Sequence, residues 1–128
     1  MPRETIGRPT IELQTSQDYL LATDYGYYDG SSDDTGALQD ALTDGAAKKK
    51  AVYAGSLIIN VTSAVTMPSG CPGLVFDLAS YGAPGDPGIV VNGSGYTALT
   101  CSGFVNQFRV NMYGTGNTAN GIHFDNVC

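Results

Sequence analysis

The sequence has few of the residues that build metal and redox centres. Its 128 residues include one histidine, His123, and three cysteines, Cys71, Cys101 and Cys128. One histidine excludes a histidine pair or a multi-histidine metal site within a single chain. Three cysteines cannot all pair within one chain, and these three lack the close CxxC spacing of a zinc or redox site. We therefore interpret them as buried thiols and expect no metal and no cofactor.

Positive charge and long apolar runs are also scarce. Six Lys and Arg residues stand against twelve Asp and Glu residues, which gives a net charge of -6. Nucleic acids and anionic membranes attract basic surfaces, so we expect neither as a partner. The first ten residues contain no apolar core of signal-peptide length, and no later stretch is long enough to span a membrane. We expect a protein made in the cytoplasm without a signal peptide.

Glycine, by contrast, is abundant, and the glycine-rich half of the chain contains an internal repeat. The 17 glycines and the 14% of charged residues favour turn-rich β-structure over a helical bundle. The segment FDLASYG at 76–82 resembles FRVNMYG at 108–114, and GIVVN at 88–92 resembles GIHFD at 121–125. Short strands that repeat about every 30 residues bury their apolar faces only if each unit stacks on the previous one. The residues expected to face inward are Phe76, Leu78, Ile89, Val91, Phe108, Val110, Met112, Ile122 and Phe124.

The repeat predicts which residues are neighbours in adjacent units. Asp77 and Arg109 hold matching outward positions, so we expect their backbones to lie about 4.8 Å apart on neighbouring strands. Cys101 and Cys128 are separated by nearly one repeat, which predicts that they lie close to one another in successive units. The strands of the first unit would expose an unpaired edge, so another element must cover it.

A helix in the first half of the chain is the predicted cover. Asp33 or Asp34 can accept hydrogen bonds from the first helical turn, so the helix should begin near Thr35 and extend over about 34–47. Gly45 and the following lysines suit the end of a helix, although two alanines after Gly45 could extend it. The apolar stripe of this helix comprises Ala37, Leu38, Ala41 and Leu42.

The segment that carries this helix start, DYGYYDGSSDDTGALQDAL at 24–42, resembles the N-terminal module of the pectate-lyase-like superfamily. That superfamily includes phage tailspikes, polysaccharide lyases and uronan epimerases. The resemblance implies an all-β fold, the start of a right-handed parallel β-helix with an N-terminal capping α-helix. We interpret residues 1–22 as an extension or connector and residues 23–128 as the cap and first coils of a β-helix truncated at 128. The sequence has Ala54-Gly55 where the family has Pro-Ala-Gly, so it departs at the proline.

The resemblance is strongest to a phage tailspike, which implies a function for the chain. We expect the N-terminal part of a homotrimeric virion protein that recognises, and in its full-length form degrades, bacterial surface polysaccharide. Such a protein would sit in the phage tail, joined to the particle or to an adaptor protein. The alternatives are a fragment of a bacterial polysaccharide lyase or uronan epimerase, and a non-catalytic structural or adhesive β-helix segment. This segment alone is expected to be inactive.

The sequence assigns no catalytic or binding residue. The polar residues at outward positions are candidates, but strand alternation alone places polar residues outside; they are Asp77, Arg109, His123 and Asp125. The acidic cluster Asp29, Asp33 and Asp34 lacks the spacing of a calcium loop and is better explained by helix capping. Three tyrosines should pack against the cap, namely Tyr25, Tyr27 and Tyr28. The sequons at Asn60 and Asn92 would be glycosylation acceptors only in a secretory setting.

Overall fold

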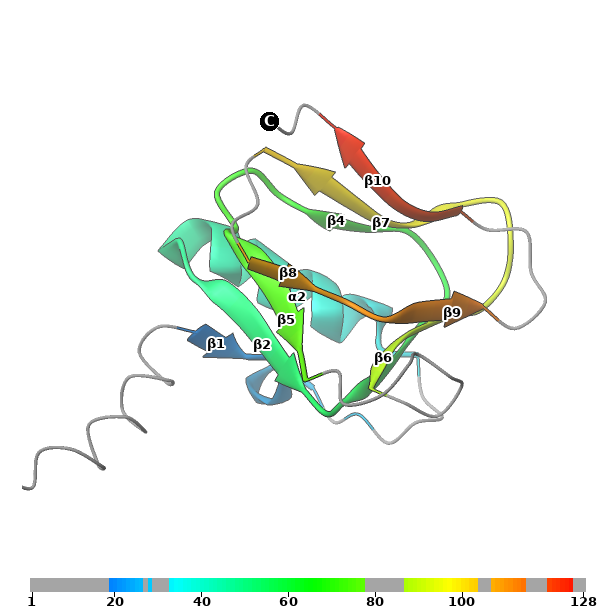
Figure 1. Ribbon diagram of the computed structural model, residues 1–128, viewed down its shortest axis with the longest axis horizontal. Coiled ribbons are helices and arrows are strands. Elements are labelled where there is room, and N and C mark those ends of the chain that lie inside the picture. Colours follow the sequence, from blue (N-terminus) through cyan, green and yellow to red (C-terminus); the bar gives the residue numbers. More distant parts are fainter. Residues whose placement is uncertain are drawn as a thin grey trace, which may run out of the picture.

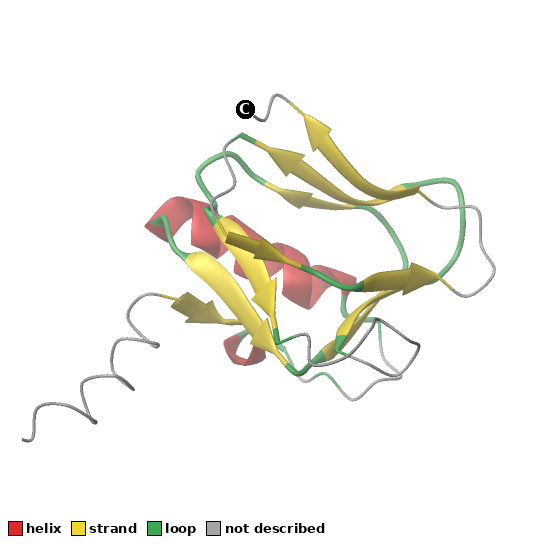
Figure 2. Cartoon of the chain, in the orientation of Figure 1, coloured by secondary structure: helices red, strands yellow, loops and turns green. Residues whose placement is uncertain are grey.

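The described part of the chain is mostly β-strand, and α2 (Thr35–Lys48) is its α-helix (Figures 1 and 2). The computed structural model describes residues 19–26, 28, 33–77, 87–103, 107–114 and 120–125. The elements are β1 Tyr19–Leu21, the short 3-10 helix η1 Ala22–Asp24, α2 Thr35–Lys48, β2 Ala51–Gly55, β3 Ile58–Val61, β4 Val65–Met67, β5 Gly73–Phe76, β6 Gly88–Val91, β7 Thr97–Ser102, β8 Gln107–Arg109, β9 Met112–Gly114 and β10 Asn120–Asp125.

The described strands form three sheets, and every strand pair is parallel. The sheet orders are β1-β2-β5-β8, β3-β6-β9 and β4-β7-β10. From β2 onward the chain contributes one strand to each sheet in turn and then repeats the same order. In Figure 1, β4, β7 and β10 lie together on one side of the molecule, away from β2, β5 and β8. The prediction of a largely β fold built from parallel strands is confirmed.

Rows of apolar side chains run across the paired strands and form one core. In the first sheet Val52, Leu74 and Phe108 are register partners, and the first two are completely buried. The expected inward positions Phe76, Ile89 and Val91 are buried, and Phe108, Val110 and Met112 pack against the core while partly exposed. Leu78 lies outside the described residues.

The helix begins where the acidic pair predicts. One carboxylate oxygen of Asp33 accepts hydrogen bonds from the backbone N–H of Thr35 at 3.0 Å and from its hydroxyl at 2.6 Å. Asp34 is the residue before the helix and is only 4% exposed, yet its side chain does not cap the helix. Its carboxylate instead accepts the N–H of Asn60 at 2.9 Å, while its own N–H donates to the Asn60 carbonyl at 2.7 Å.

The helix also bonds to the edges of the two sheets that begin with β3 and β4. The Thr35 hydroxyl accepts the N–H of Thr62 at 2.9 Å. The side-chain amide of Gln39 donates to the Thr66 carbonyl at 2.7 Å and accepts the Thr66 N–H at 2.9 Å. An amide that pairs in both directions with one strand residue reproduces the bonding of a neighbouring strand. The helix therefore replaces the missing strand at these edges.

The helix extends past Gly45, and its observed range Thr35–Lys48 agrees with the expected range of about 34–47. The helix continues to Lys48, and Lys49 takes the left-handed conformation, with φ 57° and ψ 45°. Gly45 is buried within the helix, where an added Cβ would lie 2.8 Å from the Lys50 carbonyl oxygen and 3.0 Å from Cys71 Sγ. The glycine is needed for close packing and not for a left-handed turn. The other buried helix residues are Leu38, Ala41 and Leu42, which face β2, β3 and β4.

The predicted register of the repeat is wrong by two residues. Arg109 pairs with Val75, and Phe108 pairs with Leu74, so Asp77 is not the partner of Arg109. A shift of two residues keeps every side chain on the same face, so the apolar pattern cannot distinguish the two registers.

The second pair of repeated segments also does not align. β6 pairs with β9, and β10 pairs with β7, so the segments at 88–92 and 121–125 belong to different sheets. The partner of Cys101 in the next layer is Phe124, whereas Cys128 lies outside the described residues. Alternation is common to all these strands, and a short match therefore does not identify a sheet.

Strand β1 belongs to the first sheet, although it lies within residues 1–22, the expected N-terminal extension. Residues Tyr19–Leu21 pair in parallel with Ala51–Tyr53. The other strand-like patch of that extension, residues 10–14, lies outside the described residues.

Candidate functional site

A pocket of about 280 Å³ opens on the outer side of the first sheet, where β2 turns into β3. Sites for whole drug-sized ligands have volumes of about 300–1,000 Å³, so this pocket suits a small group such as one ring. Its lining combines apolar side chains, two hydroxyl groups, one tyrosine and one carboxylate. The lining residues are Leu21, Thr23, Tyr53, Ala54, Gly55, Ser56, Leu57 and Asp77.

Strand alternation and a glycine turn position Tyr53 in this pocket. Val52 and Ala54 face the core, so Tyr53 between them faces outward and remains half-buried. Gly55 follows with φ +58°, a conformation that side chains other than glycine rarely adopt. The tyrosine ring lies beside this turn, since an added Cβ on Gly55 would be 3.4 Å from Tyr53 Cε2.

Asp77 reaches the same place from the end of β5. Its N–H donates to the Gly55 carbonyl at 2.8 Å, which fixes the backbone beside the turn. Its exposed carboxylate accepts the Tyr53 hydroxyl at 2.5 Å. This hydrogen bond, together with burial and the negative charge of Asp77, raises the pKa of Tyr53. Tyr53 therefore stays protonated at neutral pH.

A second tyrosine extends the aromatic surface beside the pocket. The ring of Tyr19 on β1 lies 6.0 Å from the ring of Tyr53, measured between centroids, with an interplanar angle of 53°. Tyr19 pairs in register with Ala51, two residues before Tyr53, so the two rings meet diagonally across the strand pair. The outer face of this sheet thus presents two adjacent rings next to a carboxylate.

The structure divides the four outward candidates between two sheets. Asp77 and Arg109 belong to the first sheet, and Arg109 is exposed on β8, one strand beyond Val75. His123 and Asp125 are on β10, which pairs with β7. His123 is exposed, and its register partner is Thr100. Of the four candidates, only Asp77 lines the pocket.

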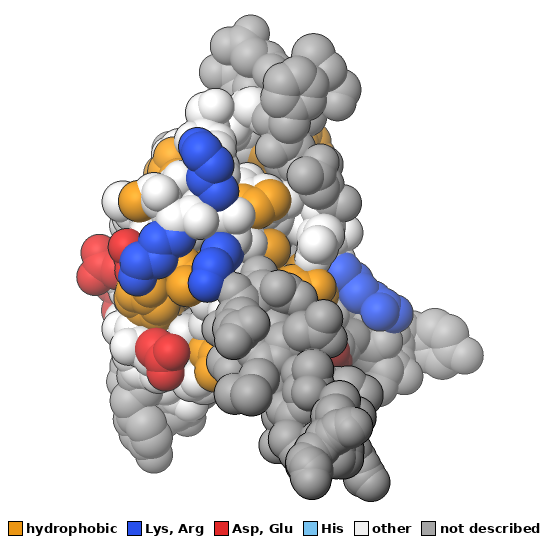
Figure 3. Space-filling view, turned by 90° about the vertical axis from the view of Figure 1, so that its left-hand side faces the viewer, with side chains coloured by type: hydrophobic (Ala, Val, Ile, Leu, Met, Phe, Trp, Pro, Cys, Tyr) orange, Lys and Arg blue, Asp and Glu red, His pale blue; other side chains and the backbone are white. Residues whose placement is uncertain are grey.

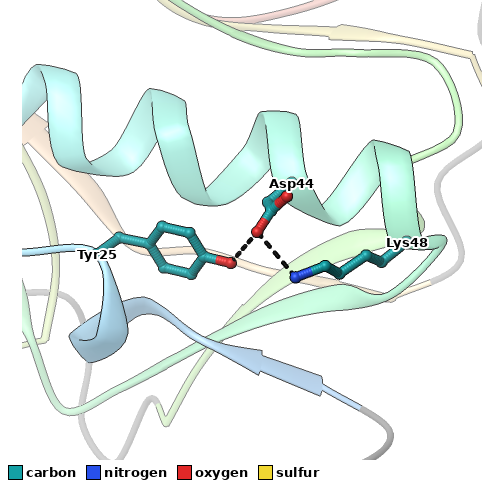
Figure 4. Close-up of polar contacts among 3 residues, drawn as sticks. All are labelled: Tyr25, Asp44 and Lys48. Carbon is teal, nitrogen blue, oxygen red and sulfur yellow. Dashed lines mark hydrogen bonds and ion pairs between the residues drawn. The ribbon is translucent and has the colours of Figure 1, made fainter.

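Outside the pocket, hydrogen bonds and an ion pair among three polar side chains connect the turn after η1 to α2. In Figure 4 the Tyr25 hydroxyl donates to the carboxylate of Asp44, which also binds Lys48 Nζ at 3.1 Å. The bond to Asp44, with burial and nearby negative charge, raises the pKa of Tyr25 to about 12. The same bonds, first to Tyr25 and then to Lys48, lower the pKa of Asp44. These bonds join the segment after η1 to α2.

The tyrosines of the segment 24–42 pack as predicted where they are described. Tyr25 and Tyr28 lie partly buried against the core, and the Tyr28 hydroxyl donates to the Ala22 carbonyl at 3.1 Å. Burial raises the pKa of Tyr28 to about 12, with a smaller contribution from Asp34. Tyr27 lies outside the described residues.

The described residues do not assemble a metal or thiol site. No group of three or more His, Cys, Asp or Glu side chains within them could hold a metal ion, and Asp29 is not among them. Cys71 and Cys101 are buried free thiols, as predicted. Burial raises the pKa of both thiols, that of Cys101 to about 11, which keeps the reactive thiolate scarce. The side-chain Nδ2 of Asn60, the atom that glycosylation would modify, is buried.

Comparison with known proteins gives no further information on this site. No family model matches the chain, and neither a curated protein nor a solved structure does. In the part of the chain that the structure describes, no helix is both long and apolar enough to cross a membrane.

Sequence reasoning missed Tyr19, Tyr53 and the pocket. The available signal was Tyr53 between two small or apolar inward residues and directly before Ala54-Gly55. A large aromatic residue at an outward strand position is a candidate for binding, because burial in the core does not explain it.

Proposed function

We propose that the chain forms the first coils of a right-handed parallel β-helix whose first coil α2 covers. The order of strand pairing supports this proposal. The elements β2, β3 and β4 belong to three different sheets, and two further sets of three strands follow in the same order. A chain that contributes to three sheets in rotation winds around one axis. Connections between parallel strands of one sheet are right-handed in about 98% of cases, which favours the right-handed form.

We further propose that this coil is the N-terminal part of a phage tailspike-like protein that recognises bacterial surface polysaccharide. In its full-length form the protein would degrade that glycan as a homotrimer attached to the phage particle or to an adaptor. The observation that carries the binding role is the Tyr53 ring beside the Asp77 carboxylate. An aromatic face suits the apolar C–H face of a sugar ring, and a carboxylate accepts hydrogen bonds from sugar hydroxyls.

A non-catalytic adhesive segment is the second candidate, and the composition of the pocket favours it for this part of the chain. Hydrolysis of a glycosidic bond requires two carboxylates, one as acid and one as base or nucleophile. Asp77 is the single carboxylate among the residues that line the pocket. These residues therefore lack the carboxylate pair of a glycoside hydrolase but can bind a sugar.

A binding and product assay tests the proposal. The chain is immobilised and exposed to capsular polysaccharides and O-antigens from a bacterial panel. We expect at least one glycan to be retained, and the Tyr53→Ala variant to bind it at least about ten-fold more weakly, a loss of about 1.4 kcal/mol. With the full-length protein, new reducing ends would indicate hydrolysis, and absorbance of unsaturated uronate would indicate a lyase.

Tyr113→Ala is the matched control, because Tyr113 is a half-buried tyrosine on β9 in another sheet. It should leave glycan retention unchanged. Retention that is equal in wild type and Tyr53→Ala would exclude the pocket as the binding site. A folded wild-type chain that retains no glycan would overturn the recognition function.

A further inference from the structure

The pocket has a charge pattern that distinguishes between classes of sugar. Its lining residues carry one charged group, the carboxylate of Asp77. The Tyr53 hydroxyl points its proton at that carboxylate, so toward a ligand it offers lone pairs. The remaining polar side chains of the lining, Thr23 and Ser56, carry hydroxyls that can donate or accept. Toward a ligand, the Asp77 carboxylate and the Tyr53 oxygen are therefore hydrogen-bond acceptors.

The cations of the described chain lie elsewhere. Lys48, Lys49 and Lys50 follow one another at the C-terminal end of α2, and Lys48 is paired with Asp44. Cationic side chains gather together on part of the face shown in Figure 3, close to acidic ones. Arg109 is on the same sheet as Tyr53, but Val75 lies between them in register. Two strand spacings amount to about 9.6 Å between the backbones of Tyr53 and Arg109.

We propose that this pocket binds a neutral sugar residue through its hydroxyl groups and rejects the corresponding uronic acid. The inference rests on the proposed recognition of polysaccharide and names the class of sugar. A neutral pyranose supplies hydroxyl donors to Asp77 and an apolar face to Tyr53, Leu21 and Leu57. A uronate brings a second carboxylate to the same place, where the two negative charges repel. The net charge of -6 adds to this repulsion at long range.

Matched glycans that differ at one carbon test this selectivity. Galactose and galacturonic acid oligosaccharides of the same length and linkage form one pair, and glucose and glucuronic acid oligosaccharides of the same length and linkage form another. Binding of each to the full chain is measured by calorimetry at low salt. We expect the neutral member of the bound pair to bind at least about ten-fold more tightly. Raising the salt concentration should reduce that ratio, because salt screens charge repulsion.

Two variants with the same change in net charge test whether the preference for the neutral sugar arises at the pocket. Asp77→Asn should weaken binding of the neutral glycan and bring the ratio of the two affinities close to one. Asp40→Asn removes a charge from an exposed position on α2 that does not line the pocket, and should leave the ratio unchanged. Circular dichroism confirms that each variant is folded.

The outcomes separate the inference from the proposed function. Equal or tighter binding of the uronate by wild type would overturn the selectivity while leaving polysaccharide recognition in place. An equal effect of Asp40→Asn and Asp77→Asn would assign the selectivity to net charge and overturn the role of the pocket. A folded chain that binds neither member of any pair would overturn the recognition function and the selectivity with it.

Discussion

The outer strands at the two opposite edges of the described sheets differ in how they are covered. At one end, side chains of Asp34, Thr35 and Gln39 bond to backbone groups from Asn60 to Thr66. The apolar side chains beneath them, such as Leu38 and Leu42, are completely buried. This end combines hydrogen bonding and apolar cover in one helix.

At the opposite edges, β8, β9 and β10 are the outer strands of the described sheets, and inward-facing side chains of β10 are exposed to solvent. Ile122 and Phe124 are 36% and 49% exposed, although their register partners Leu99 and Cys101 are 0% exposed. The ring of Phe124 finds one aromatic neighbour, Phe108, at 5.6 Å in an edge-to-face arrangement. An inward position is therefore buried only when another layer lies above it, which alternation within a strand does not provide.

Truncating one side chain at each end should give the largest difference. Leu38→Ala should destabilise the protein by about 3 kcal/mol, because it leaves a cavity in a fully buried site. Phe124→Ala should cost about 1 kcal/mol or less, since half of the side chain is already in water. Urea unfolding of both variants measures the two free energies. An equal loss would show that Phe124 is covered in solution and that the two ends do not differ.

A glycine pair tests how tightly the helix packs at the covered end. Gly45→Ala should cost about 1–3 kcal/mol, because its Cβ would press on the Lys50 carbonyl and on Cys71. Gly36→Ala is the control within the same helix, since a Cβ there meets nothing within 4 Å. It should be neutral or stabilise by up to about 1 kcal/mol. Thermal unfolding compares the two, and a harmless Gly45→Ala would mean that the helix rests loosely on the strands.

Removing the Gln39 amide tests how much the hydrogen bonds of α2 to the sheet edge stabilise the protein. Gln39→Ala should destabilise by about 1 kcal/mol, because the N–H and C=O of Thr66 lose their side-chain partner. It should also raise the tendency to aggregate, measured by light scattering, because an edge of the sheet is freed. Asp40→Ala, at an exposed helix position, is the control for the change in helix content. Unchanged stability and scattering in Gln39→Ala would assign the cover to apolar contact alone.

The smallest expected effect is the acid sensitivity of the covered end. Bonds from the Thr35 hydroxyl and N–H, followed by Thr62, lower the pKa of Asp33 in the folded state. A carboxyl with a lowered folded pKa stabilises the protein above its ordinary value of 3.8, and this contribution disappears as the pH falls through the folded pKa. Asp33→Asn should therefore reduce stability at pH 7 and flatten its dependence on pH below about 4. Denaturant titrations at several pH values measure both, and an unchanged acid slope would contradict the role of Asp33.

Particular residues show how far sequence reasoning reached. The helix start at Thr35, its apolar stripe and the buried thiols followed from local chemistry and composition. The register of Arg109 did not, because a shift of two residues preserves the faces. The close packing at Gly45 was not predicted, because the sequence cannot show that Cys71 would approach it from 26 residues away. The hydrogen bonding of Gln39 to a sheet edge was also not predicted, since its partner Thr66 is distant along the chain.

The candidate site shows the same division. Asp77 was recognised as an outward residue from alternation alone, yet its partner was predicted to be Arg109. The structure pairs its carboxylate with Tyr53, which comes from a strand that precedes it in the same sheet. The pocket exists because a glycine turn, the end of β5 and β1 meet, and no single segment encodes that meeting.

The sequence by itself determined where the helix lies and that apolar side chains alternate along strands, because these properties depend on neighbours within a few positions. Only the tertiary structure decided the strand register, the close packing at Gly45, the bonding of Gln39 to a sheet edge, and the juxtaposition of Tyr53 with Asp77. Each of these depends on contacts between distant segments, whose alternatives differ little in local propensity and are separated only when the whole core is packed.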